Sequence, residues 1–466
     1  MSLTPLSPLT PMESMNKQLA YRAIELAQRE GVSDAKVVLL QNMEQNVIVR
    51  DGKTDQLQQA MAHSLTLTLY VDGREGFFYT NDLSEDSLPG FVRQSVEFTR
   101  LLSPDEARCL PNPSRYYKGG MPDLQNCDPT LGDIPSSEKL RLTSLANAQL
   151  VGADPRVISA ETRYSDRLHR AFYLATNGLE AEEQSSRVLL TSLVTAQSPD
   201  GRHPMDGWGN VRIRFADFPY DDIASIALDR TLRKMGQRPA PTGRYTLLVE
   251  SSVAFHLLQP IINAMSGAAL FQQSSFLRDM LGKPFGSELM DMEDNPHQIG
   301  TRGASYFDYD GVATQPRKLF DKGRLQTYFI DTHYGHKLGM APTTQGLHRL
   351  IFTPGARSSS PSAPANSSLF ALPSSLQKVG LPLCDGILVT DFNGGNCDPV
   401  TGQFSYGIEG FLIQGGEIVH PVSGMNISGQ MQQLWQSLSA VGNDADPWET
   451  EVVPTLRFDD VAFSGV

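Results

Sequence analysis

The histidines are the first candidates for chemistry in this 466-residue chain, because imidazole nitrogens bind metals and transfer protons. Only His333 and His336 form a close pair, with Asp331 before them and His348 further along. A spacing of three places both rings on one face of a helix, where they could hold a metal ion. Neither an acidic residue nor a third histidine completes a metal site at a matching local spacing. We therefore expect two partly exposed polar side chains, with a divergent hydrolase site at His333 and His336 as the alternative.

Cys397 is the second candidate, because a cysteine thiolate can act as a nucleophile. Its neighbour Asp398 is negatively charged and opposes formation of a thiolate, so a nucleophilic Cys397 remains an alternative and not the expectation. The segment Asn393–Asn396 before it contains two glycines. No lysine or hydroxyl residue follows them at the offset of a phosphate-binding loop. We interpret the segment as a tight turn at the end of a strand.

Two groups of carboxylates offer oxygen ligands to a hard cation. One comprises Asp291, Glu293 and Asp294, and the other comprises Asp308 and Asp310. Carboxylates at turns are more often solvated or accept hydrogen bonds from the local backbone, and we adopt this interpretation for both groups. The chain also lacks the H-E-x-x-H, P-loop and G-x-S-x-G motifs. Its motifs alone therefore indicate no recognisable catalytic centre.

The elements that would position these residues begin with a repeated pattern. A helix, alternating strands and a second helix are predicted, and the same order then returns. The first unit has a helix at 13–30, strands at Lys36–Leu40, Gln45–Val49, Gln56–Met61 and Ser64–Val71, and a helix at Ser87–Leu102. The second unit has a helix at Ser137–Leu150, strands at Arg156–Arg163, His169–Thr176 and Ser186–Ala196, and a helix at Asp221–Lys234. We predict an α+β domain built from duplicated helix–antiparallel-strands–helix units.

A second domain is predicted after the proline-rich linker 237–243. It begins with a strand at Tyr245–Val249 and a long apolar helix at Val253–Leu270, and a later hairpin turns at Gly415 and Gly416. These signals predict a β-rich C-terminal domain, either barrel- or sandwich-like. The predicted boundaries are 1–12 for a disordered lead-in, 13–238 for the N-terminal domain and 239–466 for the C-terminal domain, with a mobile surface loop at Pro354–Ser375.

Composition and charge limit the possible functions. A chain of this length exceeds one ordinary core, which indicates two domains. The net charge of −13 and the isoelectric point of about 5.2 oppose binding to DNA or to anionic membrane surfaces. The four cysteines include no C-x-x-C pair, so we expect reduced thiols. With no signal-peptide pattern and no long apolar span, we expect a cytoplasmic protein.

Several ordered segments resemble the TldD/TldE (PmbA) family, whose members have been labelled modulators of DNA gyrase and are understood as a peptidase pair. They run from Met265 to His297, which includes MSGAALFQQSSFLRDMLG, from Tyr306 to Met340, and from Thr401 to Asp444. Near the N-terminus, VRDGKTDQLQQA and GFFYTND also fit the family's first domain. The resemblance covers nearly the whole chain, and the long ordered run makes chance similarity improbable.

The resemblance implies that this chain lacks the family's catalytic residues. TldD-like subunits carry a His-Glu-x-x-x-His helix, whose histidines bind zinc together with a cysteine near the C-terminus, while the glutamate acts as general base. Matching this pattern to VAFHLLQPIINAMSG places Gln259 and Ala264 at the ligand positions and Pro260 at the base. None of the three can perform these roles, and Asp444–Thr455 contains no cysteine. A TldE/PmbA-like chain without catalytic residues or a metal of its own is implied.

The family picture also implies a partner and a substrate. The expected assembly is a heterodimer with a TldD-like chain that holds the zinc, and the expected substrate is an unfolded peptide, bound as an extended strand in an enclosed cavity. The alternatives are a stand-alone homodimeric peptide-binding protein and a divergent hydrolase that uses His333, His336 or Cys397. No nucleic acid or membrane is expected to bind. The candidate residues of the substrate cavity are His256, Asn393, Gly394, Gly395, Tyr406 and Glu409.

Overall fold

The computed structural model describes residues 15–355, 381 and 384–465. The predicted lead-in at 1–12 and most of the predicted loop at Pro354–Ser375 lie outside the described residues. The fold is mixed α+β, as predicted. None of the helices in the described ranges combines the length and the apolar character that crossing a membrane requires.

The N-terminal half is a six-stranded antiparallel sheet with the strand order β3-β2-β1-β4-β5-β6. The first unit comprises α1 (Gln18–Arg29), β1 (Asp34–Arg50), β2 (Lys53–Val71), β3 (Arg74–Thr80) and α2 (Leu88–Leu101). The second unit comprises α3 (Ser136–Ala148), β4 (Val157–Ala175), β5 (Glu180–Ala196), β6 (Met205–Arg212) and α4 (Ile223–Arg233). The helix–strands–helix duplication is therefore confirmed. The units meet where β1 pairs with β4, and Met43 opposite Leu168 marks the middle of this pairing.

The strands are longer than the sequence pattern predicted. Each predicted pair of short strands in β1, β2 and β4 is one continuous strand of 17 to 19 residues. The predicted break in β1 falls at polar residues such as Gln41, which is buried, and β2 and β4 continue to pair with β1 on both sides of it. The short edge strands β3 and β6 were not predicted, and Gly207 and Gly209 weaken the strand signal of β6.

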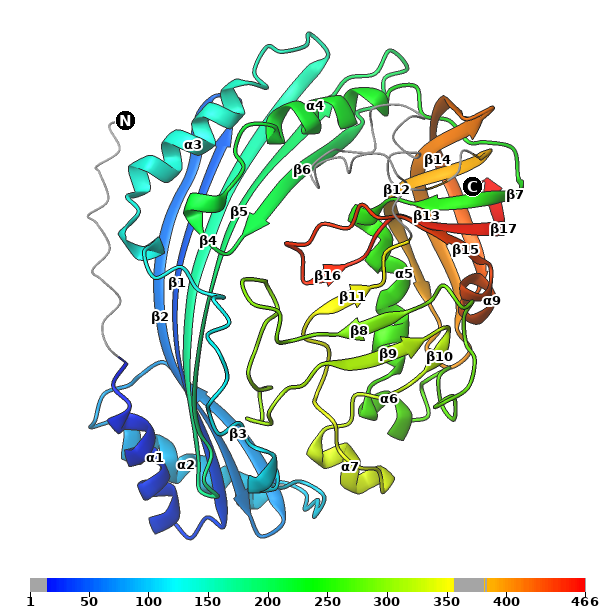
Figure 1. The fold of residues 1–466 in the computed structure, drawn as a ribbon. Helices are drawn as coiled ribbons and strands as arrows, with labels where there is room; N and C mark the ends of the chain where they lie inside the picture. The colour runs from blue at the N-terminus through cyan, green and yellow to red at the C-terminus, as the bar shows by residue number, and fades with distance from the viewer. Residues whose placement is uncertain (1–14, 356–380, 382–383, 466) are drawn as a thin grey trace.

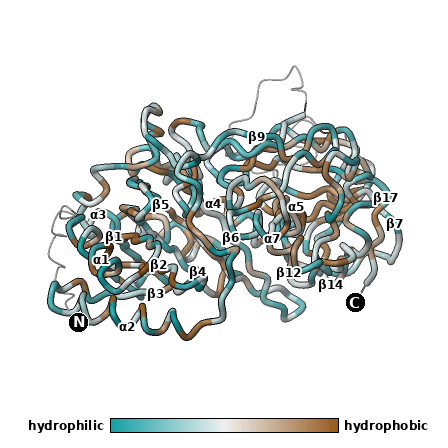
Figure 2. Tube along the Cα trace, turned by 90° about the horizontal axis from the view of Figure 1, so that it is seen from below, coloured by the Kyte–Doolittle hydropathy of each residue, from teal (hydrophilic) through white to brown (hydrophobic). Residues whose placement is uncertain are grey.

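Alternation along the strands gives the sheet two distinct faces. On β4 and β5, even-numbered residues such as Tyr164 and Leu190 are buried in clusters with the helices. Odd-numbered residues of β4, such as Tyr173, pack instead with Phe307 of the C-terminal half. Figure 1 shows the long strands curving around that half, with the concave face toward it. The same arrangement places the two halves side by side in Figure 2.

The C-terminal half contains a closed barrel. Its main sheet has the order β14-β13-β12-β7-β17-β15, and an additional pairing of β14 with β17 closes five of these strands into a ring. The strands are β7 (Gly243–Val249), β12 (Gly386–Cys397), β13 (Gln403–Gln414), β14 (Glu417–Gln430), β15 (Leu438–Val441) and β17 (Leu456–Gly465). Of the two predicted forms, the barrel is correct, and the hairpin at Gly415 and Gly416 is confirmed between β13 and β14.

A second, smaller sheet lies beside the barrel with the order β10-β9-β8-β11-β16. Its strands are β8 (Met292–Asp294), β9 (Arg317–Asp321), β10 (Arg324–Leu325), β11 (Leu350–Phe352) and β16 (Glu451–Val452). Three short helices accompany the two sheets: α6 (Gly267–Phe271), α7 (Thr332–Leu338) and α9 (Met431–Gln436).

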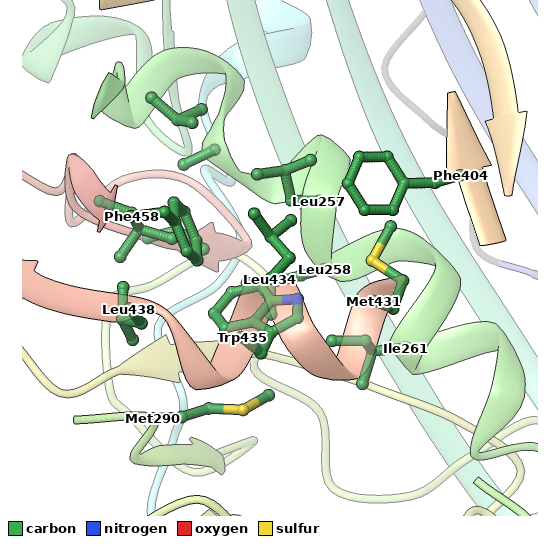
Figure 3. Close-up of a cluster of buried hydrophobic side chains, with 14 of the residues drawn as sticks. Leu257, Leu258, Ile261, Met290, Phe404, Met431, Leu434, Trp435, Leu438 and Phe458 are labelled. Atoms are coloured by element: carbon green, nitrogen blue, oxygen red, sulfur yellow. The ribbon is translucent and has the colours of Figure 1, made fainter. Parts of the chain in front are cut away.

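The predicted helix Val253–Leu270 is two helices, α5 (Ser251–Ala264) and the short α6. The break falls at Ser266, whose extended backbone caps α6 while its hydroxyl accepts a hydrogen bond from the Ala269 amide at 3.2 Å. The buried face of α5 includes Leu257, Leu258 and Ile261, which lie among Trp435, Met431 and Phe404 in Figure 3. The core thus fixes which face of α5 is left uncovered.

Candidate functional site

The uncovered face of α5 carries the positions that matter for the expected chemistry. His256, Gln259, Pro260, Asn263 and Ala264 recur at steps of three and four residues, which places them along one side of a helix. Together they line a cavity of about 340 Å³. All three positions predicted to be degenerate, Gln259, Pro260 and Ala264, therefore face the same space.

The opposite wall of this α5 cavity comes from the barrel. Gly395, Asn396 and Cys397 from the end of β12 line it, together with Tyr406 from β13. Three of the six candidate cavity residues, His256, Gly395 and Tyr406, are thereby brought together with the degenerate positions. The cavity forms where one helix crosses the end of two paired strands.

The imidazole of His256 is held between aromatic rings. It stacks on Phe392 with a centroid distance of 4.4 Å and meets the edge of Tyr406 at 4.8 Å. Burial lowers the pKa of His256, although the carboxylate of Asp391 acts in the opposite direction. The ring is therefore neutral at physiological pH and packs as an aromatic group.

The thiol of Cys397 is poorly suited to nucleophilic chemistry. Burial, followed by the negative charge of Asp398, raises its pKa to about 11. Burial also raises the pKa of Tyr406, which faces the same cavity. Both groups therefore stay protonated at neutral pH, whereas a nucleophile requires a lowered pKa or an adjacent base.

The glycine-rich segment is a bulge within β12 and not a turn at the end of a strand. The pairing with β13 shifts between Phe392 and Gly395, and Gly394 and Gly395 have φ angles of 134° and 105°. A Cβ atom at Gly395 would overlap the carbonyl oxygen of Ser405, so only glycine fits there. Asn393 and Gly394 belong to this bulge but do not line the α5 cavity.

Glu409 lies apart from the α5 cavity. Its carboxylate is 3.0 Å from the Nζ atom of Lys234, and it accepts a hydrogen bond of 3.3 Å from the side chain of Gln237. Lys234 is buried and also contacts Asp206 at 3.1 Å. Glu409 therefore ties β13 to the N-terminal half by an ion pair.

The α5 cavity does not fit a zinc ion of the type that the family resemblance implies. Gln259, Pro260 and Ala264 supply neither a good ligand nor a base at the matching positions. His256 and Cys397 are potential donors in the cavity, but one is stacked between rings and the other is held protonated. Among the residues that the structure describes, no group of three or more His, Cys, Asp or Glu side chains could hold a metal ion.

The histidine pair on α7 makes contacts with the N-terminal half. The Nε2 atom of His333 lies 3.0 Å from Asp105, which also pairs with Lys337 at 2.7 Å. Lys337, and then His333, hold the pKa of Asp105 well below its usual range. The Nδ1 atom of His336 lies 3.2 Å from the carbonyl oxygen of Ala107. These contacts dock α7 onto the segment that contains Asp105.

The remaining sequence candidates have partners that explain them structurally. Asp331 caps α7 by accepting a hydrogen bond of 2.6 Å from the Tyr334 amide. His348 lies 3.6 Å from Asp294, and Asp308 accepts hydrogen bonds from backbone amides. The other carboxylates pair with lysines: Asp291 and Glu293 with Lys318, and Asp310 with Lys36.

Sequence reasoning missed several residues of the α5 cavity. Asn263 lies four residues after Gln259 and seven after His256, so helical periodicity alone would have placed it on the same face. Its carboxamide accepts a hydrogen bond of 3.2 Å from Gln259. Phe276 and Pro399 also line the cavity, but they come from loops, where no periodic signal exists.

Comparisons with known proteins identify the family. Models of the PmbA/TldA metallopeptidase match in three consecutive parts: domain 1 at 35–97, the central domain at 129–235 and the C-terminal domain at 242–465. A metalloprotease PmbA homolog of Haemophilus influenzae is 26% identical, with 98% of each chain covered. Other curated relatives are named TldD homologs.

Solved structures agree with this result. A Bacteroides thetaiotaomicron structure, titled as a modulator of DNA gyrase, is 38% identical with a TM-score of 0.91, and the alignment covers 98% of this chain and 100% of that one. TldE from Thermococcus kodakarensis shares the fold at 18% identity, with a TM-score of 0.78 and coverage of 96% and 100%. The chain belongs to the PmbA/TldD family.

Proposed function

We propose that this member of the PmbA/TldD family is the non-catalytic, TldE/PmbA-like subunit of a two-chain metallopeptidase that acts on unfolded peptides. The observation that carries the proposal is the α5 cavity, which Gln259, Pro260 and Ala264 line without offering a metal ligand set or a base. The zinc ion belongs to a TldD-like partner chain. This chain contributes a wall of the substrate cavity.

Two further observations support the proposal. The α5 cavity keeps a defined shape of about 340 Å³ although its side chains have no catalytic groups, which suits a binding surface. The four cysteines of the chain, Cys109, Cys127, Cys384 and Cys397, are all free, as is usual for the cytoplasmic location that we assign to the pair. Relatives named TldD homologs are candidates for the partner.

The first experiment compares this chain, a TldD-like chain from the same organism and their mixture. Cleavage of an unfolded fluorogenic peptide and zinc content by elemental analysis are measured for each. We expect no cleavage and no stoichiometric zinc for this chain alone, and a stable complex that cleaves the peptide until a chelator is added. Chelator-sensitive cleavage by this chain alone would refute the proposal. A homodimer that binds peptide but does not bind the TldD-like chain would favour the stand-alone alternative.

A second experiment asks whether the α5 cavity contributes to the substrate site. Asn263→Trp places a large ring in the cavity, and Gln272→Trp places the same ring at an exposed position just after α6. In the complex, the first variant is expected to raise KM severalfold with zinc content unchanged, while the second leaves KM as it is. Equal KM values for both variants would contradict a role for the cavity in binding.

A third experiment attempts to restore the lost centre. The triple substitution Gln259→His, Pro260→Glu and Ala264→His rebuilds the family's helix pattern in this chain. We expect no peptidase activity, because the third ligand of the family is still missing from the segment Asp444–Thr455. Full activity of the triple variant on its own would show that these three losses alone separate the two kinds of subunit.

A further inference from the structure

A pocket lined by arginines lies between the sheet and the C-terminal half, away from the α5 cavity. It has a volume of about 300 Å³. Arg167 and His169 reach it from β4, Arg187 from β5, and Arg302 from the opposite, C-terminal side. We call it the arginine pocket.

Two arginines of this pocket lie opposite each other on the neighbouring strands β4 and β5. Arg167 and Arg187 are direct cross-strand partners, an arrangement in which like charges destabilise the sheet. Arg167 lies 3.3 Å from Glu44 and Arg302 lies 2.8 Å from Glu449, so each of these two has one carboxylate partner. His169 lies 3.7 Å from Glu183. These carboxylates offset part of the positive charge, and Arg187 is the pocket arginine for which the described residues provide no carboxylate partner.

Arg187 is the least satisfied member of the group. Its Nε atom is buried and has no hydrogen-bond partner within the described part of the chain. Burial lowers its pKa, and the nearby charges of Arg302 and Arg167 lower it further. A buried guanidinium donor without an acceptor is costly, and a bound anion would supply that acceptor.

The surroundings of the pocket favour a single negative charge on a longer ligand. Along β5, the odd-numbered residues lead from Arg187 past Leu189 and Thr191 to Leu193, and the last three line a larger cavity of about 870 Å³. The carboxylates of that acidic cavity include Asp391, Asp444, Asp446 and Glu451. Such a cavity repels a polyanion, so a nucleic acid or a polyphosphate would not extend into it.

The two cavities adjoin each other. Thr450 lines the arginine pocket, while Glu449 and Glu451 on either side of it line the acidic cavity. The six-residue step from Arg187 to Leu193 spans roughly 20 Å along a strand, which matches about six residues of an extended peptide. A chain with one carboxylate in the arginine pocket would therefore continue beside the acidic cavity.

We propose that the arginine pocket binds a carboxylate of an extended peptide whose chain runs along β5 toward the acidic cavity. The peptide as ligand rests on the proposed function, whereas the carboxylate preference rests on Arg167, Arg187 and Arg302. Arginine guanidinium groups bind carboxylates through two parallel hydrogen bonds, which fixes the position of the peptide end. The carboxylate belongs either to the C-terminus of the peptide or to an acidic side chain.

The test measures binding of three unlabelled, unfolded decapeptides to the full chain by isothermal titration calorimetry. The first has a free C-terminal carboxylate and no acidic residue, the second is its C-terminal amide, and the third is that amide with one internal glutamate. We expect the first or the third peptide to bind roughly tenfold or more tightly than the second. The tighter of the two identifies the source of the carboxylate. Equal affinities for all three would overturn the proposal.

Variants connect the binding to the pocket. Arg187→Gln, and independently Arg302→Gln, should weaken the carboxylate peptide by roughly ten- to hundredfold and leave the neutral amide unchanged. Arg141→Gln is the matched control, because it removes the same charge from α3, outside both the arginine pocket and the acidic cavity. An equal loss for the control and the pocket variants would reduce the effect to overall charge and overturn the proposal.

Thermal unfolding of the same variants separates binding from folding. Because burial and two neighbouring arginines oppose the charge of Arg187, Arg187→Gln should unfold at the same temperature as the wild type or at a higher one. A lower unfolding temperature with unchanged peptide affinity would make Arg187 structural and overturn the proposal. These measurements need no partner chain, so they succeed or fail independently of the two-chain peptidase.

Discussion

Substitution of Pro260 tests whether α5 has any catalytic role in this chain. Pro260 lies in the interior of the helix Ser251–Ala264, where the family pattern has the general base. A proline there has no N–H group to donate to the carbonyl oxygen of His256, four residues earlier, and its ring crowds that carbonyl. We predict that Pro260→Ala stabilises the protein and brings neither zinc binding nor peptidase activity.

The size of the effect follows from three contributions. A proline inside a helix costs about 3 kcal/mol relative to alanine. The greater conformational freedom of the unfolded variant offsets up to about 1 kcal/mol of this gain. The lost contacts of the half-buried proline ring offset a similar amount. The expected net gain is therefore about 1 kcal/mol in the free energy of unfolding. For a C-terminal half of this size, that gain corresponds to a rise of about 2–4 °C in the unfolding temperature.

Urea titration followed by circular dichroism measures this gain, with Pro399→Ala as the control. Pro399 lines the same cavity but lies in the turn after β12, where alanine gains no helical hydrogen bond, so its variant should be neutral or slightly less stable. A loss of stability in Pro260→Ala would show that the ring is required for packing and refute the reasoning. Peptidase activity or zinc binding in Pro260→Ala would contradict the prediction that α5 lacks more than a regular helix at this position.

Three further predictions concern titratable groups. Lys139→Met leaves the carboxylate of Asp166, 2.6 Å from Nζ in the wild type, without its cation, and should lower the free energy of unfolding in urea by roughly 3–5 kcal/mol. Adding Asp166→Leu should restore most of that stability. Equal losses of stability in the single and the double variant would contradict the prediction. His256→Phe keeps the ring stack but removes a group whose pKa is lowered in the folded chain. Below about pH 6.5 the unfolded wild type binds a proton that the folded chain does not, so the wild type should lose stability relative to the variant as the pH falls. A stability difference between the two that stays constant with pH would refute this prediction. Cys397, with its pKa raised to about 11, should react with iodoacetamide at pH 8 at least roughly tenfold more slowly in the folded chain than in urea, and equal rates would argue against a protonated thiol.

The sequence predicted the order of elements better than their lengths. The repeated helix–strands–helix order is visible because α1, α2 and α4 have apolar faces and glycines mark the hairpin turns, whereas the buried residues of α3 are mainly polar. The continuity of β1 is not visible, because Gln41 and Gln45 are polar yet buried in the middle of the strand. Their burial depends on pairing with β2 and β4 on both sides, which is a property of the assembled sheet.

The candidate site was predicted in part on the helix and in part on the strands, because His256, Gly395 and Tyr406 line the α5 cavity whereas the candidate Glu409 does not. His256, Gln259 and Ala264 share a face because of helical spacing alone. Tyr406 and Glu409 are three residues apart on β13, and an odd spacing sends strand side chains to opposite faces. Tyr406 accordingly lines the α5 cavity, whereas Glu409 meets Lys234. The alternation of side chains along a strand is therefore enough to separate these two candidates.

The helix α5 lines both the acidic cavity and the α5 cavity, which would let the proposed subunit without catalytic groups use the two cavities together. Its first turn, including Ser251 and Val253, lines the acidic cavity, while its later residues from His256 to Ala264 line the α5 cavity. A peptide held by the arginine pocket and the acidic cavity would therefore approach the start of α5. Substitutions in the arginine pocket should then change how tightly a peptide is held, and they should not change the zinc content of the partner. Binding and bond cleavage would thus be divided between two chains of one fold.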